Sequence, residues 1–517
     1  MGVSVGQLLR QAALQWPERI GFIERCADTD TVVEFRYAEL DLRARRAAAL
    51  LRERGVQRGD AVALVGENGA DFVAAYFGAL YAGAAVVPTP ILSAAAELRY
   101  RIEHAGCKAA IFGHRQRELT ERALSDLPEG RAVAALSLEA LGSDGASSPL
   151  PYPADTEPGD AAMILYTSGT TGKAKGAAIS HASLLTHTTV LAHRALRLGP
   201  DDRVLGVLPL THSYGCRMVM FASLFAGAPC VLMKRFDAEK SLQLMAEHGI
   251  TWVPAVPTMF AAWGLLPEGP APGALRWALS AGAPLPAEVV RRGEARLGCE
   301  IRQGYGMTEA TFATLNAPPD TRVVGSVGRP IWGIEVRVVD EAGQDQEPGR
   351  DGEVLVRGHN TMSRYLHDPA ATAEVQKDGW VQSGDVGRFD AEGRLYIVDR
   401  IKDLIIRGGN NVYPSEVEDA LSEHPDIEQV AVIGRPHDYY GEEVVAVVVR
   451  RRGSELNAAA VARFARERVA RTKVPREVAF VEAMPLGPSG KVLKRTLREQ
   501  LLAGELTAVA ASRAEDK

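Results

Sequence analysis

The amino-acid sequence predicts an α/β protein with a large N-terminal domain and a small C-terminal α+β domain. The chain has 517 residues, which is more than one hydrophobic core usually organises. Between residues 30 and 330, short β-branched segments such as 61–66 alternate with helical segments such as 71–83, a pattern typical of βαβ units. We therefore expect two α/β subdomains here, each with parallel strands covered by helices.

The pattern changes in the last third of the chain. Closely spaced strand segments separated by Gly- and Asp-rich turns predict a β-rich subdomain over residues 325–399. Beyond it, helical segments at 414–424 and 456–470 and strand segments at 429–434 and 443–450 predict a compact unit of its own. We place the domain boundary between them, with an N-terminal domain at residues 1–399 and a C-terminal domain at residues 400–517.

The composition excludes several classes of function. The 59 basic and 65 acidic residues give a net charge of −6 with no long basic run, so neither nucleic acid nor an anionic membrane is an expected partner. The apolar run Met218–Met233 is interrupted by Gly227 and Pro229 and is too short to cross a bilayer, so we expect a buried helix followed by a strand. The five cysteines form no CxxC pair, which favours a cytoplasmic location over a zinc site or disulfide framework. Small molecules are the expected partners.

The segment "YTSGTTGKAKG", residues 166–176, follows an apolar strand segment and has the composition of a phosphate-binding loop. Hydroxyls, glycine N–H groups and lysine ammonium groups all donate hydrogen bonds to phosphate oxygens. The segment differs from the P-loop pattern GxxxxGK[ST], because Thr167 stands where that pattern has its first glycine and Ala174 where it has a metal-binding hydroxyl. Taken alone, the segment could also be an ordinary polar turn.

Further motifs follow this segment in order along essentially the whole chain: "LPLTHSYG" (208–215), "SAGAPL" (280–285), "QGYGMTEA" (303–310), "GEVLVRG" (352–358), "SGDVGRFD" (383–390), "VDRIKDLIIRGGNNVYPSEVE" (398–418) and "GPSGKVLKRTL" (487–497). Together they resemble the adenylate-forming superfamily of acyl-CoA synthetases and adenylation domains, and they are most similar to fatty-acyl-CoA ligases. The resemblance implies ATP, Mg²⁺ and CoA as cofactors. It also implies attack of a substrate carboxylate on the α-phosphate of ATP, followed by transfer of the acyl group to a thiol.

The resemblance implies a nucleotide site built from several of these motifs. Thr308 would contact the α-phosphate, Tyr305 would stack on adenine, and Asp385 and Arg400 would bind the ribose. Thr167 and Glu309 are the implied metal ligands, since a hard carboxylate suits Mg²⁺. The remaining nucleotide-binding residues are the phosphate loop with its flanks, the small residues of the adenine pocket and the rest of the 303–307 motif: Thr167, Ser168, Gly169, Thr170, Thr171, Gly172, Lys173, Lys175, Gly282, Ala283, Pro284, Gln303, Gly304, Gly306 and Met307.

The C-terminal domain is expected to be mobile and to carry the catalytic lysine. Lys491 resembles the family's lysine that reaches the carboxylate and α-phosphate during adenylation, and a charge on a long stem suits a group that must arrive and leave. Lys494 and Arg495 nearby are expected to be solvated. Lys402 matches the hinge position at which the family's small domain turns between its two half-reactions.

The thiol acceptor is expected to be CoA, with a carrier protein as the alternative. Gly408 and Gly409 resemble the backbone wall of the family's pantetheine tunnel, but pantetheine is also found on acyl carrier proteins. Arg471, Lys473 and Arg476 could contact CoA phosphates or an acidic carrier, or form a solvated basic face. We find no insertion of the kind that carrier-loading relatives have, which favours free CoA.

The acid is expected to lack an α-amino group. His212 resembles the histidine at the floor of the acyl pocket of CoA ligases, and no Asp that could bind a substrate ammonium occurs between Leu208 and Met220. We expect a medium- or long-chain fatty acid, with an aryl or alicyclic acid as the alternative. Arg217, in an apolar segment, is expected to pair with an acid elsewhere in the chain or to meet a polar substrate tail. A non-catalytic relative is disfavoured because Glu309, Asp385 and Lys491 are all present.

Overall fold

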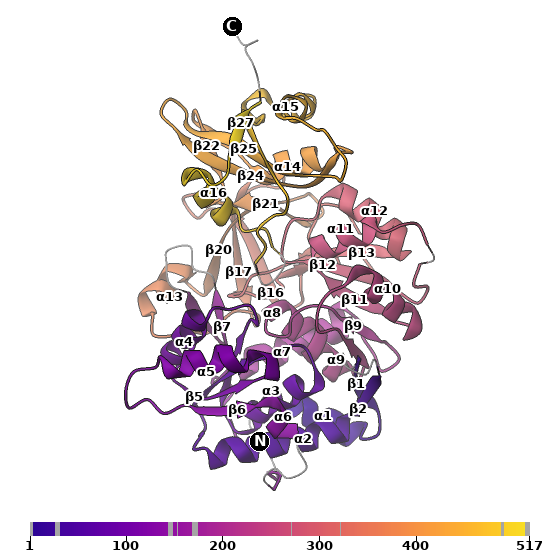
Figure 1. Cartoon of the computed structure of the whole chain (residues 1–517), viewed down its shortest axis with the longest axis vertical. Coiled ribbons are helices and arrows are strands. Elements are labelled where there is room, and N and C mark those ends of the chain that lie inside the picture. Colours follow the sequence, from indigo (N-terminus) through magenta and orange to yellow (C-terminus); the bar gives the residue numbers. More distant parts are fainter. Residues whose placement is uncertain are drawn as a thin grey trace.

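The computed structural model describes residues 4–25, 31–142, 148–151, 153–167, 174–269, 271–320, 322–487 and 491–511. Figure 1 shows a large N-terminal part with a smaller C-terminal part above it. The predicted α/β class and the division into a large and a small part are both observed. Within the described ranges, no helix has the length and the apolar character that crossing a bilayer would require.

The largest sheet contains nine strands within the described residues. In spatial order they are β15 (Arg329–Pro330), β14 (Thr314–Leu315), β13 (Glu300–Tyr305), β12 (Trp277–Ala281), β11 (Trp252–Ala255), β9 (Val204–Gly206), β10 (Cys230–Leu232), β1 (Ile20–Arg25) and β2 (Val32–Arg36). The central strands run parallel, and β13, which ends at Tyr305, lies beside β12, which ends at Ala281. The motifs that follow these two strands therefore emerge at one edge of the sheet.

A second sheet contains seven strands in the part of the chain that the structure describes. In spatial order they are β18 (Arg364–Tyr365), β8 (Lys175–Ser180), β7 (Ala161–Thr167), β4 (Ala85–Thr89), β3 (Ala61–Val65), β5 (Cys107–Phe112) and β6 (Ala134–Ser137). The expected order of two consecutive subdomains is only partly observed. β1 and β2 precede the second sheet in sequence but belong to the first, and β18 returns to the second sheet from residue 364.

Helices cover both sheets and lie between them. Their bounds in the large part are α1 (Gln7–Gln15), α2 (Tyr37–Glu53), α3 (Ala70–Tyr81), α4 (Ala95–His104), α5 (Arg117–Ser125), α6 (Leu138–Gly142), α7 (His181–Val190), α8 (Ser213–Gly215), α9 (Ala222–Ala226), α10 (Ala238–Glu247), α11 (Pro257–Leu265), α12 (Ala287–Leu297) and α13 (Pro369–Val375). α3 contacts β3 and β4 of one sheet and β1 of the other, and it is buried along almost its whole length. The expected buried helix and strand within 218–233 are observed as α9 and β10, preceded by a π-helical segment, Cys216–Phe221.

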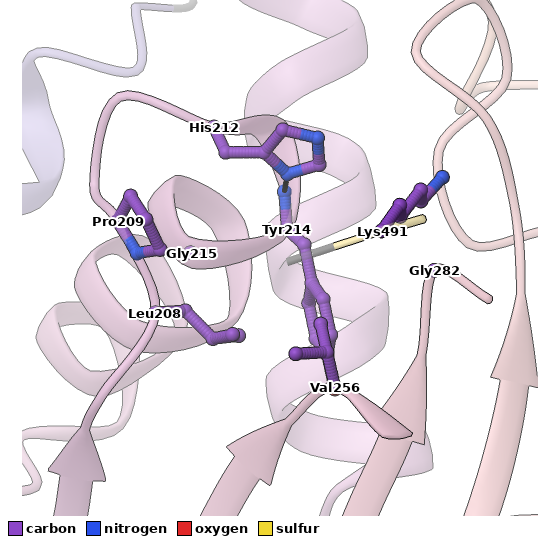
Figure 2. A pocket seen from close by; sticks show the side chains of 8 residues that line it. All are labelled: Leu208, Pro209, His212, Tyr214, Gly215, Val256, Gly282 and Lys491. Carbon is purple, nitrogen blue, oxygen red and sulfur yellow. Dashed lines mark hydrogen bonds between the residues drawn. The ribbon is translucent and has the colours of Figure 1, made fainter. Parts of the chain in front are cut away.

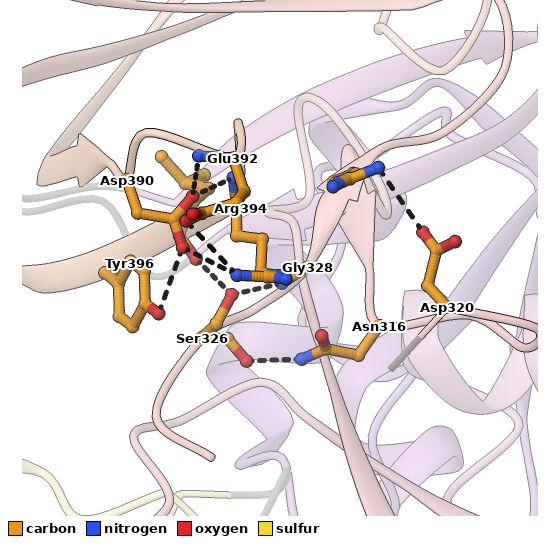
Figure 3. A network of polar contacts seen from close by, with 10 residues as sticks. Asn316, Asp320, Ser326, Gly328, Asp390, Glu392, Arg394 and Tyr396 are labelled. Carbon is orange, nitrogen blue, oxygen red and sulfur yellow. Dashed lines mark hydrogen bonds and ion pairs between the residues drawn. The ribbon is translucent and has the colours of Figure 1, made fainter. Parts of the chain in front are cut away.

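The predicted β-rich subdomain forms a third sheet, with β16 (Ile334–Val339), β17 (Gly352–Gly358), β19 (Gln376–Lys377), β20 (Trp380–Phe389) and β21 (Leu395–Arg400). Figure 3 shows a network of polar contacts where this sheet meets the segment that follows β14. Asn316 donates to the Ser326 carbonyl at 2.5 Å, and the Ser326 hydroxyl donates to the Leu395 carbonyl at 2.9 Å. In the turn before β21, the Asp390 carboxylate accepts the Arg394 N–H at 2.7 Å. The Ser326–Leu395 contact thus joins β21 to the segment between β14 and β15, and β20 and β21 supply part of the site described below.

The small part is built on a sheet of β22 (Ile405–Arg407), β23 (Asn410–Val412), β24 (Ile427–His437), β25 (Gly441–Arg450), β26 (Glu477–Val481) and β27 (Ala508–Ala510). The helices α14 (Pro414–Ser422), α15 (Ala458–Arg466) and α16 (Lys494–Leu502) cover it, and alternate side chains of β25 enter two separate hydrophobic clusters. The predicted helices and strands beyond residue 400 are therefore observed. Ser415 of α14 donates its N–H to Asp399 at 2.8 Å, so the two parts are in contact, and the exact domain boundary at 399/400 stays a prediction.

Candidate active site

Lys491 lies against the large part of the chain, in a narrow pocket shown in Figure 2. The pocket is lined by Leu208, Pro209, His212, Tyr214, Gly215, Val256, Gly282 and Lys491. Its volume is about 10 Å³, roughly the space that a single water molecule needs. A Cβ built on Gly282 would lie 3.6 Å from Lys491 Cε, so the lysine stem packs against the backbone after β12. The structure thus brings together Lys491, His212 and Gly282, which were predicted from three distant motifs.

The charges around Lys491 come from the other predicted site residues. Burial lowers the pKa of Lys491 to about 8, and the Arg400 guanidinium adds to this decrease. Asp385 and Glu309 oppose it by stabilising the ammonium form. The ammonium group therefore lies within electrostatic reach of the predicted ribose-binding and metal-binding residues, and it remains charged at neutral pH.

His212 is held in a fixed orientation at the start of α8. Its Nδ1 accepts the Tyr214 N–H at 3.2 Å, an N-cap interaction that leaves Nε2 as the protonated nitrogen of the neutral ring. Burial lowers the pKa of His212 to about 4, and the charge of Lys491 adds to the effect. Tyr214 is held in turn by its hydroxyl, which donates toward the carbonyls of Leu279 at 2.9 Å and Ala255 at 3.2 Å. His212 is therefore a neutral group beside the lysine.

Asp385, Tyr305 and Arg400 form one hydrogen-bonded cluster. The Tyr305 hydroxyl donates to Asp385 Oδ2 at 2.6 Å, and Arg400 Nε donates to Asp385 Oδ1 at 2.9 Å. Asp385 and Arg400 are directly opposite on β20 and β21, which explains how a short strand pair positions both. Asp385 is only 4% exposed. Each carboxylate oxygen keeps a free lone pair, so the cluster is able to accept hydrogen bonds from sugar hydroxyls.

Glu309 is buried and bound by a tyrosine that sequence reasoning missed. The Tyr365 hydroxyl donates to Glu309 Oε1 at 2.6 Å, and burial together with Glu309 raises the pKa of Tyr365. The Lys175 ammonium lies 5.3 Å from the centre of the Tyr365 ring. Tyr365 also lines an open pocket of about 510 Å³ with residues of the α13 region. Only the position of β18 beside β8 reveals this arrangement, because nothing in the local sequence distinguishes Tyr365.

The predicted phosphate loop, Ser168, Gly169, Thr170, Thr171, Gly172 and Lys173, lies outside the described residues, but its two flanks are defined. Thr167 ends β7 and pairs with Lys175, which begins the antiparallel strand β8. The Tyr100 hydroxyl donates to the Ala174 carbonyl at 2.9 Å, and His104 Nδ1 lies 2.8 Å from the Tyr166 hydroxyl. The flanks are thus fixed to α4, another contact that the sequence did not predict.

The other predicted nucleotide-binding residues lie at the ends of β12 and β13. Gln303, Gly304 and Tyr305 close β13 and are buried, whereas Gly306, Met307 and Thr308 follow it and are half-buried. A Cβ on Gly306 would lie 2.1 Å from the Phe312 nitrogen, so only glycine fits there. After β12, Gly282 has φ +92° and Ala283 is half-buried, and Pro284 is exposed.

Lys402, Gly408 and Gly409 are not part of this cluster. Lys402 is exposed in the turn between β21 and β22, where Asp403 N–H donates to the Arg400 carbonyl at 3.0 Å. Gly408 and Gly409 form the exposed two-residue turn of the β22–β23 hairpin, with φ of +56° and +78°. Positive φ at both positions is what a type I′ hairpin turn requires, so glycine is explained there by backbone geometry alone. The hinge role of Lys402 and the tunnel role of Gly408 and Gly409 stay predictions.

Comparison with known proteins identifies the chain. Residues 9–366 match the family described as "AMP-binding enzyme", and residues 416–491 match "AMP-binding enzyme C-terminal domain". The chain belongs to the AMP-binding enzyme family. An ATP-bound structure of MatB from Rhodopseudomonas palustris is similar to this AMP-binding enzyme with a TM-score of 0.88 and 33% identity, and it covers 97% of this chain and 99% of its own.

Curated relatives of this AMP-binding enzyme are CoA ligases. The sulfoacetate–CoA ligase of Cupriavidus necator is 35% identical over 508 residues, 96% of this chain and 97% of its own. The long-chain-fatty-acid–CoA ligase FadD13 of Mycobacterium tuberculosis is 34% identical over 509 residues, 96% of this chain and 98% of its own. The superfamily predicted from the motifs is therefore confirmed. The protein is an AMP-forming acid–CoA ligase that uses ATP and CoA.

Proposed function

We propose that this AMP-binding enzyme converts an aliphatic carboxylic acid into its acyl-CoA through an acyl-adenylate, with the predicted site residues in the predicted roles. The observation that carries the proposal is the convergence on Lys491. This lysine comes from the small part of the chain, yet it packs against Gly282 and beside His212, within electrostatic reach of Glu309 and Asp385. Such convergence supports an arrangement suited to the adenylation step.

In the first half-reaction, a carboxylate oxygen attacks the α-phosphorus of ATP and pyrophosphate leaves. Negative charge moves among the phosphoryl oxygens during this displacement, so positioned cations and hydrogen-bond donors lower its barrier. Lys491 provides the cation at the carboxylate and α-phosphate, and Thr308 provides a hydroxyl at the latter. The loop that begins after Thr167 holds the departing pyrophosphate.

The nucleoside is held by the cluster around Asp385. The carboxylate accepts hydrogen bonds from the ribose hydroxyls with its remaining lone pairs, while Arg400 and Tyr305 keep it fixed. Adenine lies against the backbone of Gly282 and Ala283 and beside the Tyr305 ring. Because Asp385 already has two partners, its orientation does not change when the nucleotide arrives.

The residues present fit a Mg²⁺ ion that is bound mainly through ATP. Within the described residues no group of three or more His, Cys, Asp or Glu side chains could hold a metal, which is in keeping with the one or two carboxylates that nucleotide-bound Mg²⁺ usually takes. Glu309 and Thr167 are the proposed ligands. The ion would neutralise phosphate charge and orient the pyrophosphate as a leaving group.

In the second half-reaction, the CoA thiol attacks the acyl carbonyl, the bond to AMP breaks and the thiol proton is lost to solvent. Lys491 fills the pocket in the structure described here, so we propose that the domain of residues 400–517 turns about Lys402 before this step. The turn at Gly408 and Gly409 then reaches the site and forms the wall of the pantetheine tunnel. Arg471, Lys473 and Arg476 are proposed to contact CoA phosphates, although Lys473 is paired with Glu416 at 2.6 Å in this structure.

The class of acid is proposed from the sequence. The names of the relatives span sulfoacetate and long-chain fatty acids, so they do not select one class. A medium- or long-chain fatty acid remains the prediction from the sequence, with an aryl or alicyclic acid as the alternative. A cytoplasmic location is proposed on the same basis, since the four described cysteines are free thiols.

The test is a panel of carboxylic acids incubated with the purified full chain, ATP, Mg²⁺ and CoA. Pyrophosphate release should require an acid, and acyl-CoA should form in equal amount. Hydroxamate formation with hydroxylamine but no acyl-CoA, together with acylation of a phosphopantetheinylated carrier protein, would favour the carrier-loading alternative. Absence of pyrophosphate release with every class of acid would refute the proposed function.

A further inference from the structure

Arg217 is a buried cation that has no partner in the described part of the chain. It lies in the π-helical segment Cys216–Phe221, and its side chain is fully buried, with 0% exposed. Its Nε and both Nη atoms are buried without a hydrogen bond among the described residues. Burial lowers its pKa to about 10, so it remains charged at neutral pH, and the groups that act on it, Cys216 and Tyr76, include no carboxylate. The expected pairing with an acid of the chain is therefore not observed among the described residues.

His187 of α7 lies within electrostatic range of Arg217 and is equally unsatisfied. It is fully buried, and both of its ring nitrogens lack hydrogen-bond partners among the described residues. Burial lowers its pKa well below the usual range, and the charges of Arg217 and His359 add to this effect. The ring is therefore neutral and has an N–H group to donate. Buried polar groups in proteins are almost always hydrogen-bonded, so Arg217 and His187 have donor groups that an anionic ligand would satisfy.

A series of contacts between polar residues relates His187 to the acyl pocket. Ser213, next to His212, lies 3.1 Å from Thr311, hydroxyl to hydroxyl. The Thr311 carbonyl accepts Asn360 Nδ2 at 3.0 Å, while Asn360 Oδ1 lacks a partner among the described residues. His359 precedes Asn360 in the chain and is half-buried, and its ring centre lies 5.3 Å from that of His187. These contacts relate Ser213, which is next to the pocket residue His212, to His187.

The course of the backbone also places Arg217 near the pocket around Lys491. Gly215, which lines the pocket around Lys491, precedes Arg217 by two residues in one continuous helical segment formed by α8 and the π-helix. A Cβ on Gly215 would lie 2.2 Å from the Pro209 carbonyl oxygen, so this helix is held tightly against the pocket. Arg217 is therefore two residues from the pocket wall, in a helix that is packed against it.

We propose that Arg217 and His187 form a subsite for a second anionic group, a carboxylate or sulfonate, at the far end of the acid substrate. The inference rests on the proposed function and narrows it: one carboxylate is activated beside Lys491, and the other end of an aliphatic chain carries a charge. A guanidinium binds a planar or tetrahedral anion through two parallel hydrogen bonds, and His187 adds a third donor. A plain fatty acid would place a methyl group there and leave Arg217 uncompensated.

The first test compares acids of equal chain length as substrates of the wild-type enzyme. α,ω-Dicarboxylates and ω-sulfo carboxylates of three to ten carbons are assayed beside the monocarboxylates of equal length, by pyrophosphate release and acyl-CoA formation. We expect kcat/KM for the best dianionic acid to exceed that for its monocarboxylate by at least about tenfold. The relative rates with the two dianionic series show which anion is preferred. A monocarboxylate that is used better than both dianionic acids at every length would overturn the inference while leaving the proposed function intact.

The second test removes the positive charge of Arg217 by substitution. Arg217→Met should lower the ratio of kcat/KM for the dianionic acid over its monocarboxylate by about 100-fold, since a buried charge pair is lost, and Arg217→Lys should retain part of it. Arg337→Met is the matched control, because Arg337 forms a surface ion pair with Asp345 in the β-rich subdomain. An equal fall with both acids in Arg217→Met would mean a structural role only and would refute the subsite.

A binding readout keeps the inference testable if the variant is inactive. The preferred dianionic acid, added without ATP, should raise the unfolding midpoint of the wild type, and the same concentration should not shift that of Arg217→Met. Its monocarboxylate should shift neither. Equal shifts of both proteins by the dianionic acid would show that it binds elsewhere. If no acid gives pyrophosphate but the wild type alone is stabilised by the dianion, the subsite holds, and the proposed acid and the proposed roles of the site residues in adenylation fail.

Discussion

Asp385 and Arg217 are both buried charges near the pocket, yet their surroundings are opposite. Asp385 is 4% exposed and accepts hydrogen bonds from Tyr305 and Arg400, whereas Arg217 is fully buried and has no partner among the described residues. A charge that is compensated within the chain can only orient a ligand through its remaining hydrogen bonds. A charge that is not compensated gains most from a ligand of opposite sign. The difference separates the proposed nucleotide site, which would orient its ligand, from the proposed Arg217 subsite, which would select its ligand by charge.

The largest expected effect is on the free energy of unfolding, and it compares a paired and an unpaired buried arginine. Arg407 is 8% exposed and donates to Glu443 through Nε at 2.6 Å and Nη2 at 3.2 Å. Arg407→Met should lower the free energy of unfolding by about 3–5 kcal/mol, because it leaves a buried carboxylate unpaired. Arg217→Met should change it by less than about 1 kcal/mol, because it removes a charge that has no partner and keeps a similar volume. Thermal or urea unfolding measures the loss of stability in both variants. Equal destabilisation would contradict the proposal that Arg407 is paired and Arg217 is not.

Removing the lysine amine should produce the next largest effect. Lys491→Ala is expected to lower the rate of acid-dependent pyrophosphate release by about 10²–10³-fold, since one positioned charge is lost at the reacting phosphate. Thioester formation from supplied acyl-adenylate and CoA should be largely retained. Arg495→Ala is the matched control, because Arg495 pairs with Glu499 on the exposed face of α16. Equal loss in both half-reactions would refute the role assigned to Lys491.

The cluster of Asp385, Tyr305 and Arg400 should bind ATP less well when Asp385 loses its negative charge. Asp385→Asn keeps the shape of the side chain but places an amide N–H toward Arg400, so we expect kcat/KM for ATP to fall about 10–100-fold. Asp351→Asn should have an effect of less than about threefold, since Asp351 forms only a surface pair with Arg388. Steady-state kinetics with varied ATP measures both. A similar effect of the two variants would argue against a nucleotide role for Asp385.

The pH dependence should be set by Lys491. Its pKa is lowered to about 8, so the fraction of charged lysine in the free enzyme falls about tenfold for each pH unit above that value. The adenylation kcat/KM should therefore be flat near pH 7 and fall above pH 8, and His212, whose pKa is about 4, should add no acid limb above pH 5. Lys491→Arg stays charged and should lose the alkaline limb. An activity that rises with pH through 8 would contradict this assignment.

The smallest of these effects should come from Tyr365. Tyr365→Phe removes the hydroxyl that donates to Glu309 at 2.6 Å, and we expect the Mg²⁺ concentration for half-maximal activity to rise about fivefold to tenfold. Tyr396→Phe is a matched control, because its hydroxyl donates to Asp390 in a surface turn, as Figure 3 shows. An unchanged Mg²⁺ dependence in Tyr365→Phe would mean that Glu309 needs no support or that the metal is held elsewhere.

Local elements of the fold were predictable because their signals are local. The helices α14 and α15 and the strands β24 and β25 lie where hydrophobic periodicity placed them, within a few residues. Sheet membership was not predictable in the same way. β18 is two residues long and joins a sheet whose other strands end before residue 181, and no periodicity marks such a pairing. Strand pairing depends on contacts between distant segments, which a single sequence does not display.

In the candidate site, too, motifs predicted individual residues, whereas the contacts between them were seen only in the fold. Asp385, Arg400 and Tyr305 were predicted from motifs, but their mutual hydrogen bonds follow from the β20–β21 register and the end of β13. Tyr365 was missed because a lone tyrosine outside any motif carries no signal. Arg217 was noticed as a charge in an apolar run, yet its two interpretations could be separated only by its surroundings in the fold.

By itself, the sequence determined the fold class, the family and the kinds of chemistry available, because periodicity and motif spacing are properties of neighbouring residues. Tertiary structure decided which side chains have partners. It joined Asp385 to Tyr305 and Arg400, Glu309 to Tyr365, and left Arg217 and His187 without any among the described residues. The physical reason is that desolvation and pairing depend on what surrounds a group in space, and burial makes that surrounding matter most.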